Sequence, residues 1–196
     1  MKKPYDKNKI GKFIGWGGEH LVYEYEKDKV IKFSLHIWLS GRKAVEKKMQ
    51  DYQVGKHYFS KYLLQTDILA WDGGKRAIEI QKKIKCRFLH KDDLRIKELN
   101  EQFHDLMQCH QKMLKETNTS MDFIGREGLL KAGKNNEISN VLVTLDKNNK
   151  YNKSNQLVLI DFTLLKIIPK FYEWPLWLLI EWAKRRQKKL LKKFIK

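Results

Sequence analysis

The sequence is poor in cysteine, proline, acidic residues and long hydrophobic runs, and each scarcity excludes a class of protein. The two cysteines, Cys86 and Cys109, lack CxxC spacing and clustered histidines, so we expect neither a disulfide framework nor a zinc site. No apolar run reaches the roughly 18 residues that cross a bilayer, and none follows the basic N-terminus as in a secretory signal. Three prolines and 42% hydrophobic residues are typical of a folded core. These features predict one folded, cytoplasmic protein in a reducing compartment.

Positive charge is the property that the chain has in excess. Its 196 residues contain 41 Lys and Arg against 23 Asp and Glu, a formal net charge of +18. Such a charge indicates an anionic partner, which is nucleic acid, a phosphate-rich substrate or acidic lipid. A lysine-rich composition from an AT-rich genome explains the same number without any partner. Charge alone does not choose between these interpretations.

The hydrophobic pattern predicts a chain of mixed α and β structure. Helical spacing of apolar residues indicates helices over 41–63 and 96–113 and an amphipathic basic helix near the C-terminus. Short apolar runs bounded by turn residues indicate strands. These runs are 12–15, 21–25, 29–33, 63–71, 77–84, 141–145 and 157–162. The polar stretch 146–156 is expected to be the loop of a hairpin.

A glycine-rich segment separates the first two expected strands. Gly15, Gly17 and Gly18 have no Cβ, so their backbone amides can approach phosphate oxygens, and Val22 would return as a strand residue that covers an adenine. A turn between two strands also argues against a dinucleotide-binding fold, in which the glycines open a helix. A plain β-turn accounts for the same glycines.

Lys32 is a charged residue inside an apolar strand, an expensive position unless an anion meets it. It is therefore a candidate phosphate ligand. Glu46, on the helix that follows, is the expected carboxylate partner that orients Lys32. The alternative is a lysine at the sheet edge whose amine reaches solvent, together with a solvated glutamate.

Two oxygen-bearing side chains lie at the ends of the late strands. Asp161 ends the apolar strand 157–162, and Asn140 begins the preceding one. A carboxylate and an amide oxygen are hard ligands that suit Mg²⁺ bridging nucleotide phosphates. The alternative for Asp161 is a simple cap at a strand end.

Together these segments resemble the protein-kinase-like superfamily. The segment from Gly15 to Val22 is similar to its glycine-rich loop, Val30-Ile31-Lys32 to its VAIK strand, and Asp161-Phe162-Thr163 to its DFG motif. The resemblance covers residues 10–166 and is nearest to small bacterial kinases, such as Kdo and lipopolysaccharide-core kinases and PhoP-regulated kinase-like proteins. It implies an ATP- and Mg²⁺-dependent phosphotransferase. It also implies that residues 80–85, Gln81 included, form the hinge that meets adenine through its backbone.

The resemblance predicts an α+β fold in two lobes. Residues 1–84 would form an N-lobe with a five-stranded antiparallel sheet and one helix, and residues 85–196 a small, mainly helical C-lobe. Only 35 residues follow Asp161, too few for a peptide-docking platform. The acceptor would therefore be a hydroxyl of a small, sugar or lipid-linked molecule, or one specific protein.

The expected catalytic base is missing from its usual position. The family places an aspartate five residues before its metal-binding asparagine, where this chain has Asn135. An amide cannot accept the hydroxyl proton, so Glu137 or Asp122 substitutes, or the protein is a nucleotide-binding pseudokinase with a regulatory role. The third DFG position is Thr163, which leaves the metal ligand Asp161 in place.

The basic C-terminal segment has two interpretations. Residues 174–196 combine tryptophans with many lysines, which suits an anionic membrane at the inner face of the cell. Alternatively the apolar stripe packs on the C-lobe and the lysines are solvated. A basic nucleic-acid-binding domain is a third function class, which rests on net charge alone.

Overall fold

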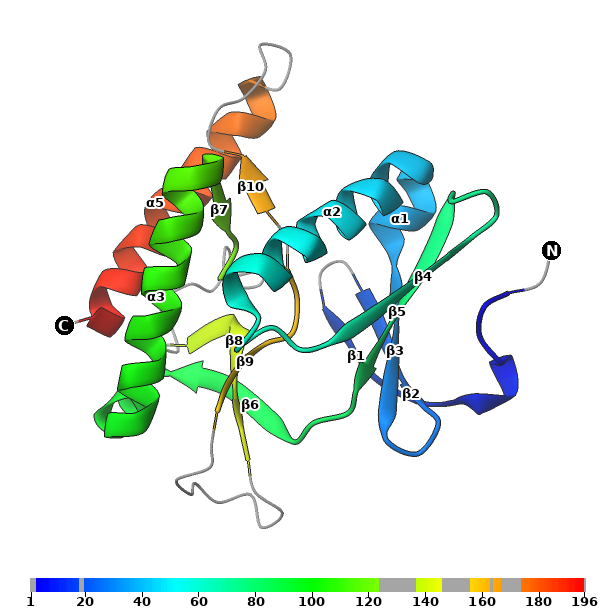
Figure 1. The fold of residues 1–196 in the computed structure, drawn as a ribbon, viewed down its shortest axis with the longest axis horizontal. Helices are drawn as coiled ribbons and strands as arrows, with labels where there is room; N and C mark the ends of the chain where they lie inside the picture. Colours follow the sequence, from blue (N-terminus) through cyan, green and yellow to red (C-terminus); the bar gives the residue numbers. More distant parts are fainter. Residues whose placement is uncertain are drawn as a thin grey trace. The chain divides into compact units, whose positions relative to one another are not determined.

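The computed structural model of the protein describes residues 3–17, 20–123, 137–145, 156–162, 164–166 and 174–195. The chain folds into two compact units (Figure 1). The first unit comprises residues 1–54 and 64–84, and the second comprises residues 55–63 and 85–196. The split expected after residue 84 falls on one of these borders, whereas residues 55–63 join the second unit.

A five-stranded antiparallel sheet forms the body of the first unit. The strands are β1 (Ile10–Gly17), β2 (His20–Tyr25), β3 (Lys29–Ser34), β4 (Thr66–Trp71) and β5 (Arg76–Lys82). Their order in the sheet is β1-β2-β3-β5-β4, so the hairpin partner β5 inserts between β3 and β4. The expected sheet of five antiparallel strands is confirmed.

The two faces of this sheet differ in chemistry because successive side chains of a strand point to opposite sides. On the face that we call the outer face, Tyr25, Ile31, Ile78 and Ile80 form a buried cluster to which Tyr5 of the N-terminal segment adds its ring. The opposite face, called the inner face, has a smaller apolar cluster of Ile37, Ala44, Val45 and Ala77, with Ile68 packed against it. The inner face therefore receives the helices of the first unit.

Helices α1 (Leu35–Ser40) and α2 (Arg42–Phe59) follow β3. Ser34 begins α1 as its N-cap, because its Oγ accepts a hydrogen bond of 3.3 Å from the backbone amide of Ile37. Gly41 ends α1 at φ +64°, a conformation that favours glycine and separates the two helices. The single helix expected over 41–63 is therefore preceded by a short one and ends at Phe59.

The described residues of the second unit form two long helices and two small antiparallel sheets. The helices are α3 (Lys97–Thr117) and α5 (Trp174–Ile195). One sheet has the order β6-β8-β9, with β6 (Cys86–His90), β8 (Glu137–Thr144) and β9 (Leu157–Leu159); the other pairs β7 (Thr119–Met121) with β10 (Leu164–Lys166). Short strands thus accompany the long helices in the described part of this unit, and the expectation of a small, mainly helical C-lobe stays a prediction.

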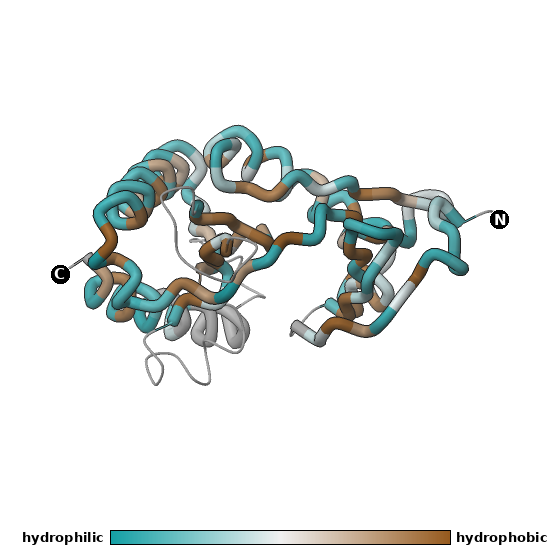
Figure 2. The backbone as a smooth tube through the Cα atoms, turned by 90° about the horizontal axis from the view of Figure 1, so that it is seen from below, coloured by the Kyte–Doolittle hydropathy of each residue, from teal (hydrophilic) through white to brown (hydrophobic). Residues whose placement is uncertain are grey.

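The amphipathic pattern of α3 supplies the centre of the second core. Leu99, Phe103, Leu106 and Met113 are all buried and recur at three- and four-residue spacing, as the sequence predicted. Phe103 packs against Phe194 of α5, with ring centroids 5.9 Å apart. Figure 2 shows hydrophobic and hydrophilic residues interspersed along the traced chain.

Cys86 and Cys109 are free thiols. No helix in the described part of the chain is long and apolar enough to cross a membrane.

Candidate functional site

Strand register brings Lys32 opposite Glu79 at the centre of the first unit's sheet. Lys32 of β3 pairs with Val22 of β2 on one side and with Glu79 of β5 on the other. Directly paired residues of antiparallel strands point to the same face, so all three side chains lie on the inner face. Lys32 is 7% exposed and Glu79 is 3% exposed. A buried cation and a buried carboxylate therefore lie directly opposite each other on neighbouring strands.

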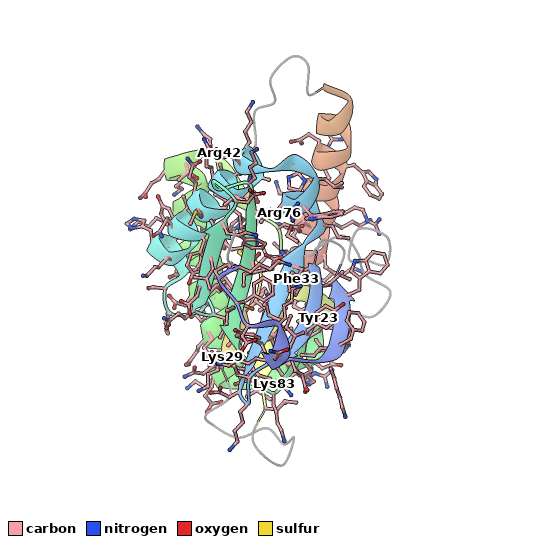
Figure 3. The ribbon with its side chains drawn as sticks, turned by 90° about the vertical axis from the view of Figure 1, so that its right-hand side faces the viewer. Tyr23, Lys29, Phe33, Arg42, Arg76 and Lys83 are labelled. Carbon is pink, nitrogen blue, oxygen red and sulfur yellow. The ribbon has the colours of Figure 1, made fainter. Side chains whose placement is uncertain are left out.

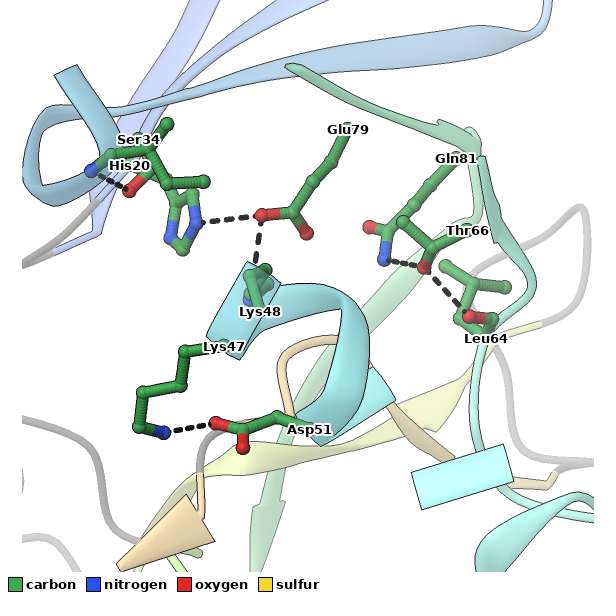
Figure 4. Close-up of polar contacts among 10 residues, drawn as sticks. His20, Ser34, Lys47, Lys48, Asp51, Leu64, Thr66, Glu79 and Gln81 are labelled. Atoms are coloured by element: carbon green, nitrogen blue, oxygen red, sulfur yellow. Dashed lines mark hydrogen bonds and ion pairs between the residues drawn. The ribbon is translucent and has the colours of Figure 1, made fainter. Parts of the chain in front are cut away.

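Helix α2 and strand β2 bring two more polar groups to Glu79. Val45 is buried in the apolar cluster of the inner face, and Lys48 lies one turn further along the same side of α2. Its Nζ is 3.3 Å from Oε1 of Glu79, and Nε2 of His20 lies 3.0 Å from that same oxygen (Figure 4). We call His20, Lys32, Lys48 and Glu79 the charged cluster.

Glu79 is the electrostatic centre of the charged cluster. Burial by itself would raise the pKa of this carboxyl, because the charged form loses its water. The Lys48 ammonium, the hydrogen bond from His20 and the charges of His20 and Lys32 outweigh burial, so the pKa of Glu79 lies below its usual value. Glu79 is accordingly ionised at neutral pH and holds the cationic side chains that face it.

The expectation that Glu46 orients Lys32 is wrong. Glu46 is exposed on α2, and it forms no ion pair with any residue that the structure describes. It follows Val45 by one residue, which rotates it about 100° away from the buried side of the helix. Glu79 takes the position beside Lys32 that the sequence pattern predicted for Glu46.

Gly15 and Gly17 of the glycine-rich segment lie in β1, which pairs antiparallel with β2. Gly15 pairs with Val22, and Gly17 pairs with His20 at the end of the β1–β2 ladder. A Cβ at Gly15 would meet no atom within 4 Å, so the backbone there is open to approach. Gly18 lies outside the described residues.

Gln81 is held inside the sheet. Its backbone lies between Val30 and Thr66 in the strand register, and its Nε2 donates a 2.6 Å hydrogen bond to Oγ1 of Thr66 (Figure 4). Residues 83–85 continue the chain beyond β5, where the amide of Lys83 donates to the carbonyl of Asp28 at 2.7 Å. The adenine-binding role expected for the backbone of 80–85 stays a prediction.

In the second unit, Asn140 and Asp161 lie at the same end of the β8–β9 ladder. Val141 pairs with Leu159, Asn140 immediately precedes Val141, and Asp161 follows Leu159 by two residues. Nδ2 of Asn140 donates a 2.7 Å hydrogen bond to the carbonyl of Asp122, which leaves its amide oxygen as the group suited to a cation. Both are half-buried. This local geometry is compatible with a role as metal ligands, and that role stays a prediction.

The structure gives fewer contacts for the residues that were expected to replace the catalytic base. Glu137 begins β8 and pairs with His90, three residues before Asn140, and is half-buried. Asp122 contributes its backbone carbonyl to Asn140. Asn135 and Thr163 lie outside the described residues.

The second half of the C-terminal helix packs on its own unit. Leu190, Leu191 and Phe194 are buried, whereas Lys188, Lys189, Lys192 and Lys193 are exposed. The apolar stripe at this end of the helix is therefore unavailable to a bilayer, and its lysines face solvent. Membrane association through residues 174–196 stays a prediction.

Sequence reasoning missed Glu79, His20 and Lys48. The signal for Glu79 was present, because it interrupts the apolar strand 77–80 just as Lys32 interrupts its own strand. A buried charge in each of two strands indicates that the strands are paired with those charges facing each other. His20 and Lys48 carried no comparable local signal.

Comparison with protein-family models and with curated proteins yields no match to this chain. Interpretation of the charged cluster therefore rests on its own geometry and chemistry.

Proposed function

We propose that the protein is a nucleotide-binding phosphotransferase of the protein-kinase-like superfamily, which uses ATP and Mg²⁺ and transfers phosphate to a hydroxyl of a small, sugar or lipid-linked acceptor. The observation that carries the proposal is the buried Lys32 of β3, which lies opposite the buried carboxylate Glu79 in the strand register. A buried lysine beside a carboxylate is a positive charge that suits nucleotide phosphates. The strand order β1-β2-β3-β5-β4 supports the same assignment.

Each side chain of the charged cluster has a distinct part in this proposal. Lys32 would bind the phosphates and Glu79 would hold its ammonium in place. His20 and Lys48 would keep Glu79 ionised, since both lie against one carboxylate oxygen. Catalysis would consist mainly of positioning and charge neutralisation.

Asn140 and Asp161 would hold Mg²⁺ in the second unit. The ion would supply charge neutralisation at the phosphates, and these side chains offer the amide and carboxylate oxygens that it prefers. Their common place at one end of the β8–β9 ladder supports the assignment. The hydrogen bond from Asn140 to the Asp122 carbonyl orients the amide oxygen.

The test is binding of a fluorescent ATP analogue and thermal stabilisation by ATP with MgCl₂. Stabilisation follows the ratio of ligand concentration to Kd. We expect Lys32→Met to abolish binding, and Asp161→Ala to abolish the part that requires Mg²⁺. Lys29→Gln is the matched control, because Lys29 lies on the same strand but pairs with Glu26. Unchanged ATP binding in a folded Lys32→Met variant would overturn the proposal.

A second candidate is a nucleotide-binding regulatory module without turnover. Asn135 at the position of the usual aspartate base favours it. Measurement of ATP turnover in wild type and in Asn135→Asp separates the two. A large gain in Asn135→Asp shows that only the base was missing, whereas tight binding without turnover in either protein favours the regulatory module.

A further inference from the structure

A concave site lies mainly on the outer face of the first unit's sheet, on the side opposite Glu79, and it reaches Ile37 and Ala77 of the inner-face apolar cluster. It is a cavity of about 560 Å³ between the sheet, the N-terminal segment and α1. Its main lining residues are Tyr5, Tyr23, Phe33, Trp38, Trp71 and Arg76, and we call it the aromatic pocket. A pocket of several hundred Å³ with apolar walls and few polar groups is typical of a small-ligand site.

The walls of the aromatic pocket are packed before any ligand arrives. Tyr5 packs its ring edge-on against Phe33 at 5.6 Å and against Trp71 at 5.9 Å between centroids. Tyr23 continues the row at 5.9 Å from Phe33. Figure 3 looks onto this side of the sheet, with Tyr23 and Phe33 near its middle and Arg76 above them. These contacts anchor the N-terminal segment as one wall, so a ligand would meet a preformed surface.

The charge of the aromatic pocket has one sign. Lys3 and Arg76 contribute to the lining, and no carboxylate is among the described residues that line it. Arg76 is exposed and forms an ion pair with Asp72, whose Oδ2 lies 3.6 Å from its Nε, too far for a hydrogen bond. Its guanidinium can therefore donate to an anionic head group.

Helix α1 adds exposed apolar surface in and beside the aromatic pocket. Trp38 is 67% exposed and the neighbouring Leu39 is 80% exposed, both on α1. Exposed large apolar side chains beside a concave surface indicate a ligand or an interface. Because the surface is hollowed rather than flat, it suits a chain that enters it better than a bilayer that lies across it.

We propose that the aromatic pocket binds a single amphipathic anion, an acyl chain with a carboxylate head. The chain lies against Tyr23, Phe33 and Trp38, and the carboxylate binds Arg76 with Lys3 nearby. This site is independent of the phosphotransferase proposal, since its lining includes no residue of the charged cluster and neither Asn140 nor Asp161.

The test is titration of the protein with dodecanoate below its micelle concentration, followed by calorimetry and tryptophan fluorescence. We expect saturable binding that is weaker for dodecanol and absent for dodecyltrimethylammonium. Arg76→Gln should weaken dodecanoate binding about tenfold, the effect of losing one charged hydrogen bond. Lys75→Gln is the control, because Lys75 is exposed beside Arg76 and does not line the pocket.

Trp38→Ala tests the apolar wall without threatening the fold, because this side chain is mostly exposed. It should weaken dodecanoate and dodecanol alike. Equal affinity for the anionic and cationic amphiphiles would overturn the proposal. So would binding only to phosphatidylglycerol vesicles, or self-association that Trp38→Ala abolishes without any dodecanoate binding, since these assign the face to a membrane or to a second copy.

Discussion

The buried carboxylate Glu79 interacts with more charged groups than the residues around it in the sequence. Glu79 faces His20 and Lys48 through one oxygen and lies opposite Lys32, so one carboxylate balances several buried groups. Removal of one member of a buried charged cluster leaves the others without compensation, which costs more than the cluster contributes in total. Substitution of such a residue is therefore a sensitive test of the structure.

Glu79→Gln should destabilise the protein by about 2 to 4 kcal/mol, because it leaves buried cations without a carboxylate. The pKa of Glu79 is lowered in the folded state. The stabilisation that Glu79 gives to the folded protein is therefore complete above pH 4.5, its ordinary pKa, and declines as pH falls below that value. Urea unfolding at several pH values measures both effects. The control is Glu24→Gln, whose partner Lys83 is solvent-exposed, and which should change stability much less. Equal losses in the two variants would contradict the central role of Glu79.

Gly55 of α2 is a position where any side chain meets an obstacle. A Cβ there would lie 2.8 Å from Cγ of Phe162, a ring that also packs against Phe59. Gly55→Ala should therefore cost about 1 to 3 kcal/mol by overpacking, although alanine favours a helix. Chemical denaturation measures the change. Gly15→Ala, which has open space around its Cβ, should show no such loss, and stabilisation by Gly55→Ala would refute the packing argument.

His110 on α3 behaves as a neutral core histidine. Its Nε2 shares a 3.1 Å hydrogen bond with Ser120, its ring packs edge-on against Phe123, and burial lowers its pKa to about 4 from 6.5. The unfolded chain takes up the proton first, so stability is full above pH 6.5 and falls by roughly 2 to 3 kcal/mol as pH drops towards 4. His110→Gln should remove this decline, whereas His104→Gln, at an exposed position on the same helix, should retain it. Denaturant titrations across this pH range decide.

At the scale of elements, the second unit is held together by side chains that satisfy backbone groups across the fold. Gln187 of α5 is buried, accepts a 3.0 Å hydrogen bond from the amide of Phe123 and donates one of 2.9 Å to the carbonyl of Met121. It thereby attaches the C-terminal helix to the end of β7. Phe194, two turns further along, adds the apolar contact with Phe103.

Gln187→Leu should loosen α5, because two buried backbone groups lose their partners. We expect a loss of about 2 to 4 kcal/mol in unfolding free energy. Amide exchange should become faster at Phe123 and along residues 187–195. The neighbouring substitution Lys188→Gln, at an exposed position, should leave both measurements unchanged. Undisturbed exchange in Gln187→Leu would show that apolar packing alone holds the helix.

For the whole molecule, positive charge is the dominant long-range property. A net charge of +18 on 196 residues opposes the compact state through self-repulsion. Surface ion pairs such as Lys9–Glu26 and Lys61–Asp105 act in the opposite direction but are weak in water. Salt should therefore weaken the self-repulsion more than it weakens the ion pairs, and so stabilise the folded protein.

Raising NaCl from about 10 mM to about 150 mM should raise the Tm, because the screening length falls from about 30 Å to about 8 Å. Scanning calorimetry measures the shift. Chloride and acetate at equal ionic strength should give the same shift if screening is the cause. A Tm that falls with salt would show that the ion pairs outweigh self-repulsion.

The sequence by itself determined the local elements that apolar periodicity encodes. The stripe of Leu99, Phe103 and Leu106 predicted α3, and the alternating runs predicted the strands that form the first sheet. It also singled out Lys32, since a charge within an apolar strand is costly wherever that strand is placed. Short elements such as α1 and β7 were missed, because a few residues carry too little periodicity.

Only the tertiary structure decided which groups meet Lys32. Strand register placed Glu79 opposite it, and the rotation of α2 turned Glu46 outward and Lys48 inward. Register and helix rotation depend on how two faces pack, and residues as far apart as His20 and Glu79 become neighbours only through that packing. Local sequence periodicity shows which face of an element is buried, but long-range packing decides what that face is buried against.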